Sequence, residues 1–386
     1  MEKITYLDNA ATTALDTRVL DAMLPYLGEQ YGNPSSSYAF GRLSRAAIEL
    51  ARKTVATHLG VKATNIYFTS GGTESNNTAI SCAINDLGCS HVITSAIEHH
   101  SVLHTVQHHC ASSAVSCSYV RLDKYGQVDL LDLEQQLTSK SANGIKCLVS
   151  LMHANNEIGA ILDIGRVGEL CRNHSAIFHS DCVQTIGHYA INLAEVGVHF
   201  ASASGHKFHG PKGTGILYVS NDTSLTPYIH GGGQERKKRA GTENVHGIIG
   251  FSEALNIAMQ QLVEDQEKIV GLNQKMQRGL LSISSEITFN SFTDCLYTVL
   301  SVNFPQGSDT DLLLSSFDRN GICASGGSAC SSGDDGGSHV IAALGNNIPG
   351  ATIRFSFSRM TSECDIDYAI SRIAVELGKI ENKVAH

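Results

Sequence analysis

The sequence lacks the patterns that mark several classes of protein. No stretch is long and apolar enough to span a membrane, and the N-terminus, MEKITYLDNAATT, has no apolar core of signal-peptide length. The eleven cysteines form no C-x-x-C pair, which argues against a zinc site of that pattern. In a chain of 386 residues they also make no secreted disulfide framework. We therefore expect a cytoplasmic protein with reduced thiols, no bound metal and no membrane contact.

Basic charge is scarce as well. A formal net charge of -9 offers no surface suited to nucleic acid or an anionic membrane. The one basic run, residues 236–239, lies in a Gly-rich segment and suits either a solvated loop or contact with a phosphate or carboxylate. With 42% hydrophobic residues and no repeat, the chain has core material for two domains, or for one large domain with a smaller companion.

Apolar strand-like runs alternate with helical patterns over the first two thirds of the chain. Residues 41–59 have a helical pattern ending at Gly60, with one apolar face that includes Leu43, Leu50 and Val55. Near-continuous apolar runs between helices indicate a buried parallel sheet. The strand-like runs are residues 65–70, 91–97, 147–154, 176–181, 199–204 and 215–220. The sequence therefore predicts an α/β fold with a mainly parallel sheet flanked by helices.

The last third of the chain has a different pattern. A long helical segment, residues 247–281, leads from the α/β part into a region where strand-like runs at 299–304 and 352–357 mix with helices. This mixture is typical of a smaller α+β domain. We predict a large domain of residues 16–257 and a small domain made of residues 1–15 and 258–386.

An aspartate and a lysine each follow a predicted strand. Asp181 ends the run 176–181, and Lys207 follows the run 199–204 within Ser204-Gly205-His206-Lys207. Side chains at the carboxyl ends of parallel strands converge on one ligand. Pyridoxal phosphate (PLP) needs a lysine that holds it covalently and a carboxylate that pairs with its ring nitrogen. The alternative is a surface lysine after a strand, so the other motifs decide between the two.

The segment from Ser70 to Asn77 follows a predicted strand and opens a helical run. Gly71 and Gly72 let the backbone approach an anion closely, and the start of a helix offers free N–H groups. Thr73 adds a hydroxyl group. A tight strand-to-helix turn would explain the glycines alone, but the combination predicts a phosphate cradle.

Two further strand ends carry polar side chains. His99 follows the run 91–97, and its flat imidazole can stack on a pyridine ring or move protons near neutral pH. The alternative for His99 is a capping or core histidine. The segment 153–159, His-Ala-Asn-Asn-Glu-Ile-Gly, also follows a strand, and a carboxamide there can bond a ring oxygen or a substrate carboxylate.

Taken in order, these motifs resemble the class I cysteine desulfurases of the NifS/IscS type, within the aspartate-aminotransferase-like PLP fold type I enzymes. The resemblance covers nearly the whole chain. The matching segments are YLDNAATT (6–13), GNPSS (32–36), SGGTESNN (70–77), EHHSVL (98–103), HANNEIG (153–159), DCVQ (181–184), SGHK (204–207), GGGQERKKRAGTENV (231–245), GSACSS (327–332) and TIRFSFSR (352–359).

The resemblance implies PLP as the cofactor and a role for each residue around it. Lys207 would hold PLP, Asp181 would pair with its ring nitrogen and His99 would stack on the ring. Gln184 and Asn155 would hydrogen-bond the ring oxygen or the substrate. The phosphate would be bound by residues of three segments: Gly72, Thr73, Ser204, His206 and, from the partner chain of a homodimer, Thr242.

The resemblance also implies how the substrate is held. Arg354 would grip the carboxylate of L-cysteine with its bidentate fork, with Asn33 and Asn155 also at the substrate. Cys330 would be the nucleophile that accepts the sulfur. It lies in a segment, residues 321–337, with six glycines, which we expect to be no regular element, so that its thiol can travel. The other cysteines are expected to be inert.

The sequence thus predicts an enzyme that converts L-cysteine to L-alanine and forms a persulfide on Cys330. A sulfur-acceptor protein, either an iron–sulfur scaffold or a carrier for tRNA or cofactor thiolation, would take the sulfur. Selenocysteine lyase or aminotransferase activity are alternatives, and an aminotransferase has no need of Cys330. A non-catalytic sulfur-carrier scaffold would need neither Lys207 nor Arg354. Gly333-Asp334-Asp335-Gly336-Gly337 departs from the family pattern and leaves the acceptor open.

Overall fold

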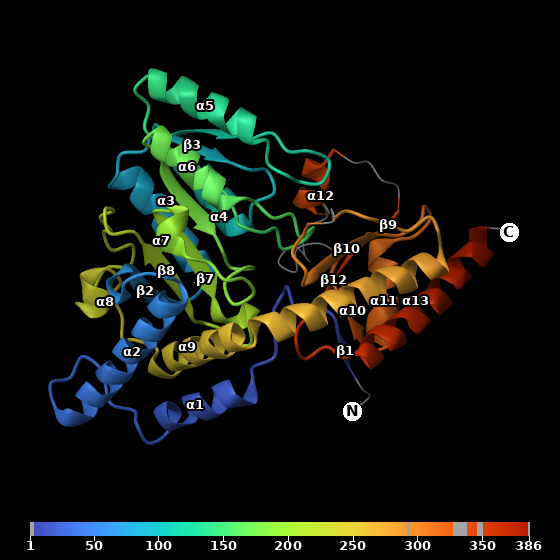
Figure 1. Cartoon of the computed structure of the whole chain (residues 1–386), viewed down its shortest axis with the longest axis horizontal. Coiled ribbons are helices and arrows are strands. Elements are labelled where there is room, and N and C mark those ends of the chain that lie inside the picture. The colour runs from blue at the N-terminus through green and yellow to red at the C-terminus, as the bar shows by residue number, and fades with distance from the viewer. Residues whose placement is uncertain (1–3, 292–293, 327–337, 346–349, 385–386) are drawn as a thin grey trace.

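The computed structural model describes residues 4–291, 294–326, 338–345 and 350–384. Its largest element is a seven-stranded sheet of order β2-β8-β7-β6-β5-β3-β4 (Figure 1). The strands are β2 (Ile66–Thr69), β3 (His91–Thr94), β4 (Ser116–Tyr119), β5 (Cys147–Ser150), β6 (Ile177–Asp181), β7 (Phe200–Ser204) and β8 (Gly215–Val219). The predicted α/β class with a mainly parallel sheet is confirmed.

One strand of the sheet runs against the others. β8 pairs antiparallel with both β2 and β7, whereas β3 to β7 pair in parallel. The connection between β7 and β8 consists of residues 205–214 and contains only a short 3-10 helix, Gly205–Lys207. A parallel return needs a crossover of a dozen or more residues, usually with a full helix. The short connection, which includes Lys207, therefore makes β8 antiparallel to β7.

Helices cover both faces of this sheet. Successive strand residues such as Val92 and Ile93, or Leu148 and Val149, pack into different apolar clusters, because a strand alternates its side chains between two faces. α3 and α4 cover one face, and α2, α5, α6 and α9 cover the other. The helices of this part are α1 (Thr17–Leu27), α2 (Ala39–His58), α3 (Gly72–Asn85), α4 (His100–Ser112), α5 (Leu130–Ala142), α6 (Ile164–Asn173), α7 (Leu193–Val196), α8 (Gln234–Lys237) and α9 (Val245–Gln260).

The apolar face predicted for residues 41–59 is partly wrong. α2 buries Ile48, Ala51 and Val55, which are spaced three and four residues apart and face α9. Leu43 and Leu50 are 60% and 67% exposed. These two leucines lie one heptad apart on a different side of the helix, so their hydrophobicity is not used in the core of this chain.

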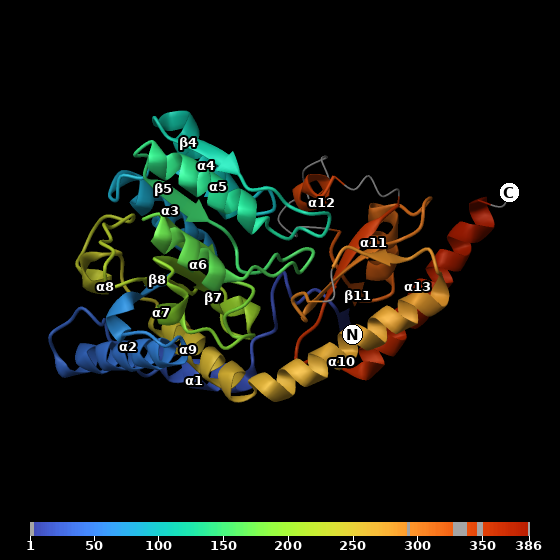
Figure 2. The ribbon, with the colours of Figure 1, turned by 45° about the horizontal axis from the view of Figure 1, so that its top comes forward.

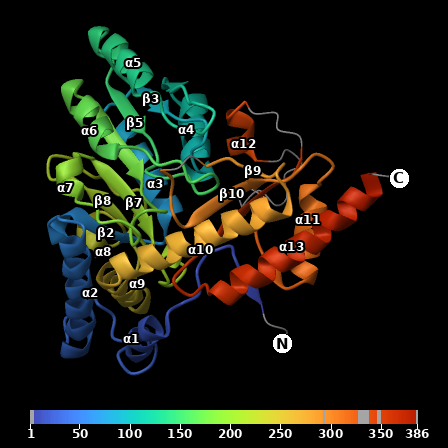
Figure 3. The same ribbon diagram turned by 45° about the vertical axis from the view of Figure 1, so that its right-hand side comes forward.

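A second, smaller group of elements lies beside the large sheet (Figure 2). It has a three-stranded antiparallel sheet of order β12-β10-β9 and a parallel pair, β1 with β11. α10 and α13 run side by side along it (Figure 3). The elements are β1 (Thr5–Tyr6), β9 (Thr288–Phe289), β10 (Val299–Asn303), β11 (Ile322–Cys323), β12 (Thr352–Ser356), α10 (Leu262–Ile283), α11 (Thr310–Arg319), α12 (His339–Ala343) and α13 (Glu363–Val384).

Two apolar clusters accompany this division. The cluster under α2 and α9 includes Ile257, while the second cluster combines Leu7 with residues from Ile269 to Leu377. The single long helix expected at 247–281 is instead two helices. Gln261 lies between α9 and α10, and its ψ of 7° is not helical. The domain boundary at 257/258 stays a prediction, and the membership of the two clusters supports it.

Candidate active site

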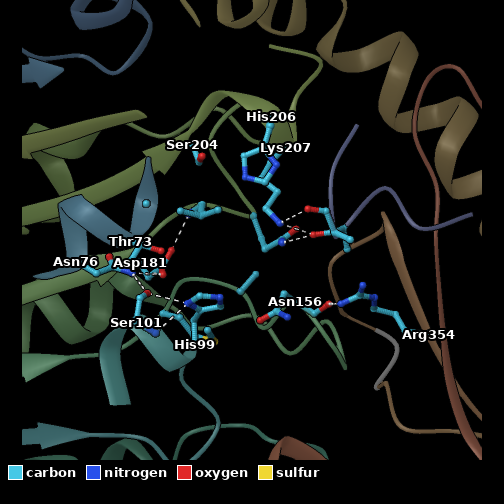
Figure 4. A pocket seen from close by; sticks show the side chains of 17 residues that line it. Thr73, Asn76, His99, Ser101, Asn156, Asp181, Ser204, His206, Lys207 and Arg354 are labelled. Atoms are coloured by element: carbon cyan, nitrogen blue, oxygen red, sulfur yellow. Dashed lines mark hydrogen bonds between the residues drawn. The ribbon is translucent and has the colours of Figure 1, made fainter. Parts of the chain in front are cut away.

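A cavity of about 200 Å³ lies at the carboxyl ends of the parallel strands, facing β12 (Figure 4). Nine of the residues predicted for the site line it, and they come from five separate segments of the chain. These residues are Gly72, Thr73, His99, Asp181, Gln184, Ser204, His206, Lys207 and Arg354. The cavity is also lined by residues that the sequence analysis gave no role: Ala10, Ala11, Asn76, Ser101, Met152, Ala154, Asn156 and Val183.

Lys207 is positioned by the turn that follows β7. The Gly205 N–H donates to the Thr214 carbonyl oxygen at 3.0 Å, which closes this turn. The Nζ of Lys207 donates to the carbonyl oxygens of Ala10 at 2.6 Å and Ala11 at 2.8 Å. The N-terminal segment therefore holds the amine inside the cavity, where it can bond a carbonyl carbon or move a proton.

Asp181 ends β6, and both of its carboxylate oxygens accept hydrogen bonds. Oδ2 accepts from Nδ2 of Asn76 at 2.7 Å, and Oδ1 accepts from the Val183 N–H at 3.0 Å. The residue is only 7% exposed, yet it lines the cavity. Donors on both oxygens hold the carboxylate in place at the cavity, where it can pair with a protonated ring nitrogen.

His99 is the N-cap of α4. Its Nδ1 accepts from the Ser101 N–H at 3.1 Å and lies 2.7 Å from the Ser101 hydroxyl oxygen. A backbone N–H can only donate, so the proton of the neutral ring is on Nε2. Burial lowers the pKa of His99, and the Lys207 ammonium lowers it further, while Asp181 opposes both. The imidazole therefore stays neutral, with Nδ1 accepting from Ser101 and Nε2 carrying the N–H.

The start of α3 forms one end of the cavity. A Cβ atom on Gly72 would lie 2.6 Å from Cγ2 of Val183, so only glycine fits between the helix and the turn after β6. The first N–H groups of a helix have no partner within it and attract anions. Ser204 and His206 line the same end. Burial lowers the pKa of His206 to about 4, and the nearby lysines add to this, so the ring is neutral at pH 7.

Arg354 lies across the cavity from Asp181, with Asn156 between them (Figure 4). Its side chain is 2% exposed. Nη2 donates to Oδ1 of Asp8 at 2.6 Å, and Nη1 donates to the Asn156 carbonyl oxygen at 2.9 Å. Nε is buried and has no hydrogen-bond partner among the described residues. A buried cationic side chain that lines the cavity and keeps a donor without a partner fits an anionic ligand.

Three predicted site residues lie outside this lining. The Asn155 carboxamide is fully buried and binds backbone, donating to the Ile97 carbonyl and accepting from the Glu157 and Ile158 N–H groups. Asn33 is exposed ahead of α2 and accepts from the N–H two residues on. Thr242 lines a separate cavity of about 180 Å³. Their roles remain predictions, and Cys330 lies outside the described residues.

Several cavity residues were missed because their polar partners are distant in sequence. Asn76 joins Asp181 to Ser101, and Asp8 joins Arg354 to Ser325. All of the missed residues except Met152 and Ser325 lie in segments that carried the family resemblance, but a motif does not show which side chain faces the ligand. Asn155 and Asn156 are adjacent and chemically identical, so the sequence does not distinguish them. The fold shows that Asn155 binds backbone groups and that Asn156 lines the cavity.

The comparisons with known proteins agree with this geometry. The family model described as aminotransferase class-V matches residues 5–369. A cysteine desulfurase IscS of Methanosarcina thermophila is 41% identical over 98% of this chain and 93% of its own, and a putative cysteine desulfurase IscS of Bacillus subtilis is 38% identical over 100% and 98%.

Solved structures of similar fold also include relatives of the cysteine desulfurases. A NifS-like protein superposes with a TM-score of 0.89 at 34% identity, covering 97% of this chain and all of its own. SspA, solved in complex with cysteine, superposes at 0.78 with 30% identity, covering 92% of this chain and 99% of its own. The chain therefore belongs to the aminotransferase class-V family and, within it, to the PLP-dependent cysteine desulfurases of the NifS/IscS type.

The cavity fits PLP. The start of α3 offers donors for a phosphate, Asp181 offers a carboxylate for the ring nitrogen and Lys207 offers an amine for the aldehyde carbon. The buried Oδ1 of Asn76 has no partner among the described residues and leaves one further acceptor at the cavity. Among the same residues no group of three or more His, Cys, Asp or Glu side chains is arranged to hold a metal ion, and no helix is long and apolar enough to cross a membrane.

Proposed function

We propose that the protein moves the sulfur of L-cysteine to Cys330, releases L-alanine and then gives the sulfur to an acceptor protein. The observation that carries this proposal is that Lys207, Asp181 and Arg354 line one cavity. A non-catalytic scaffold needs none of the three. The relative solved with cysteine bound supports an amino acid of that size as the substrate.

Each side chain has a distinct task in this reaction. When bound, PLP supplies an electron sink for the carbon next to the substrate's carboxylate. Asp181 keeps the ring nitrogen protonated, and Lys207 first holds the cofactor and then moves the α-proton. Arg354 binds the α-carboxylate and so directs the sulfur-bearing side chain of the substrate. The neutral His99 covers the ring and donates from Nε2.

The sulfur step balances without a further reactant. The Cys330 thiolate attacks the sulfur of the substrate, the carbon–sulfur bond breaks, and its electron pair returns to the carbon skeleton, which takes up protons to become L-alanine. The enzyme thiol becomes a persulfide, so one cysteine and one thiol yield one alanine and one persulfide. An acceptor thiol then attacks the outer sulfur. We propose iron–sulfur cluster assembly or tRNA and cofactor thiolation as the use of this sulfur.

We also propose that the active unit is a homodimer, in which Thr242 of one chain contacts the phosphate in the other. Thr242 lies outside the cavity of its own chain, in agreement with such a role. Exposed leucines on α1 and α2 supply apolar surface that a second copy can cover. These leucines are Leu20, Leu24, Leu27, Leu43 and Leu50.

The decisive experiment is to incubate the PLP-loaded protein with L-cysteine and measure alanine and sulfide with and without a thiol reductant. We expect alanine and sulfide in equal amounts when reductant is present, because the reductant releases the persulfide sulfur. Without reductant, turnover stops after about one alanine per site. Cys330→Ala is expected to release no sulfide. Formation of 3-mercaptopyruvate without sulfide, with the amino group left on the cofactor, would indicate aminotransferase chemistry and contradict the proposal.

A further inference from the structure

Asp8 is the counter-charge of Arg354. Its Oδ1 accepts from Nη2 of Arg354 at 2.6 Å, and its side chain is 15% exposed beside an arginine that is 2% exposed. Its other oxygen, Oδ2, accepts from the Ser325 hydroxyl at 2.8 Å. Ser325 is itself fixed to Arg354 by two backbone hydrogen bonds of 2.7 and 3.2 Å. Asp8 is therefore held in place from two sides.

Arg354 still has donors for a second anion. A guanidinium group has five N–H donors, and the described residues use two of its nitrogens, Nη1 with Asn156 and Nη2 with Asp8. Nε remains buried without a partner among them. A substrate carboxylate that binds here meets an arginine whose charge is already offset by Asp8, and it also comes close to that second carboxylate.

We propose that Asp8 competes with the substrate's α-carboxylate for Arg354 and thereby limits how tightly substrate and product bind. The proposal rests on Arg354 being the carboxylate site, as argued under the proposed function. Without an anion, a buried guanidinium is costly, so Asp8 stabilises the empty site. The Asp8 carboxylate also offsets the positive field of Arg354 that attracts the substrate carboxylate, and it repels the negative charge of that carboxylate. L-Alanine carries the same carboxylate as L-cysteine, so Asp8 also promotes product release.

Asp8→Asn separates competition from simple positioning. The asparagine Oδ1 can still accept from Nη2, and the Ser325 hydroxyl can turn to accept from the new amide, so both contacts survive while the charge is lost. We expect the Kd of the PLP-loaded protein for L-alanine to fall about fivefold to tenfold. Ethylamine, which is alanine without its carboxylate, should bind with an unchanged Kd. If Asp8 only positions Arg354, alanine should bind no better.

Ser325→Ala provides a second variant in case Asp8→Asn folds poorly. It leaves the backbone pairing with Arg354 in place and removes only the donor to Oδ2, which concentrates the negative charge of Asp8 on Arg354. Alanine should then bind more weakly than to the wild type. Asp16→Asn is the matched control, because Asp16 is a buried carboxylate paired with Arg359 outside the cavity. It should leave the alanine Kd unchanged.

Binding is followed by the change in the visible spectrum of the bound cofactor and, independently, by calorimetry. Arg354→Lys tells the two proposals apart. If it weakens alanine binding while Asp8→Asn does not tighten it, competition by Asp8 is wrong and the carboxylate role of Arg354 stands. If Arg354→Lys binds alanine as the wild type does, the carboxylate is held elsewhere. Both the carboxylate role of Arg354 and the competition by Asp8 are then wrong.

Discussion

The amide of Asn76 donates to Oδ2 of Asp181 at 2.7 Å and to the Ser101 hydroxyl at 2.8 Å. Ser101 in turn contacts Nδ1 of His99. One buried amide on α3 therefore connects the carboxylate proposed for the ring nitrogen with the imidazole proposed to cover the ring. This relation gives Asn76 a positioning role, because its donor holds the Asp181 carboxylate in place.

Replacing Asn76 with aspartate should weaken cofactor binding. The new carboxylate would stand where the amide now donates, and two carboxylates at hydrogen-bond distance share a proton, which raises the pKa of one of them. Asp181 would then pair poorly with a protonated ring nitrogen. We expect the Kd for PLP to rise at least about tenfold, measured by titration of the apoprotein. Asn77→Asp changes the next residue of α3, outside the lining of this cavity, and equal losses in both variants would contradict the assigned role.

Lys207→Ala should abolish covalent retention of PLP and the turnover of L-cysteine. The Nζ of Lys207 is fixed by two carbonyl oxygens inside the cavity, and no other described lysine lines it. The measurements are the visible absorbance of the purified protein and alanine release. Added PLP should restore some bound cofactor without restoring turnover, because the group that moves the α-proton is missing. Normal turnover by the variant would remove Lys207 from the mechanism.

How far the sequence predicted the site depends on the range of the interactions. Gly72 and Lys207 were found because they follow strands, and the carboxyl ends of parallel strands meet at one edge whatever the rest of the fold does. Arg354 was found by family resemblance alone, since its strand belongs to another sheet. The contact of Ala10 with Lys207 spans 197 residues, and no local pattern predicts such a pairing.

The errors in the fold have equally local causes. The period of the apolar residues in α2 predicted a helix correctly, but periodicity does not tell which of two overlapping stripes is buried, so Leu43 and Leu50 were placed inside. In the segment 247–281 the apolar spacing suits one continuous helix, and no proline or glycine stands beside Gln261 to signal the break there. Packing of α9 against α1 and α2, and of α10 against α13, explains two helices there.

Thr242 can be tested by mixing subunits. If Thr242 acts in the partner's site, Thr242→Ala should weaken PLP retention, and a mixture of Thr242→Ala with Lys207→Ala chains should regain activity after unfolding and refolding together. In a mixed dimer, one site then receives an intact Lys207 from one chain and an intact Thr242 from the other. If Thr242 serves its own chain, both sites of the mixed dimer are defective. A mixture no more active than its parents would exclude the contact across the interface.

Glu98 should make the stability of the protein fall at alkaline pH. Its carboxyl group is buried between Ser95 and the Met152 N–H, which both donate to Oε1, while Oε2 has no partner among the described residues. Burial raises the pKa of Glu98 to about 8, and the charge of Asp181 adds to this. The folded state therefore binds a proton between about pH 4.5 and 8 that the unfolded state has released. The stabilisation from this proton is complete below the unfolded pKa and is lost as the pH rises through the folded pKa.

Glu98→Gln isolates this contribution. The glutamine oxygen can accept the same two hydrogen bonds, and its amide replaces the protonated oxygen without any charge to bury. We expect the free energy of unfolding, from urea titrations, to rise relative to the wild type by about 1–3 kcal/mol at pH 9 and to change little at pH 4.5. Ser95→Ala loses one donor to Oε1 but keeps the ionisable group, so it should lower stability and retain the alkaline decline. A Glu98→Gln protein whose stability falls between pH 6 and 9 as steeply as that of the wild type would show that Glu98 ionises freely in the fold, against the burial that the structure shows.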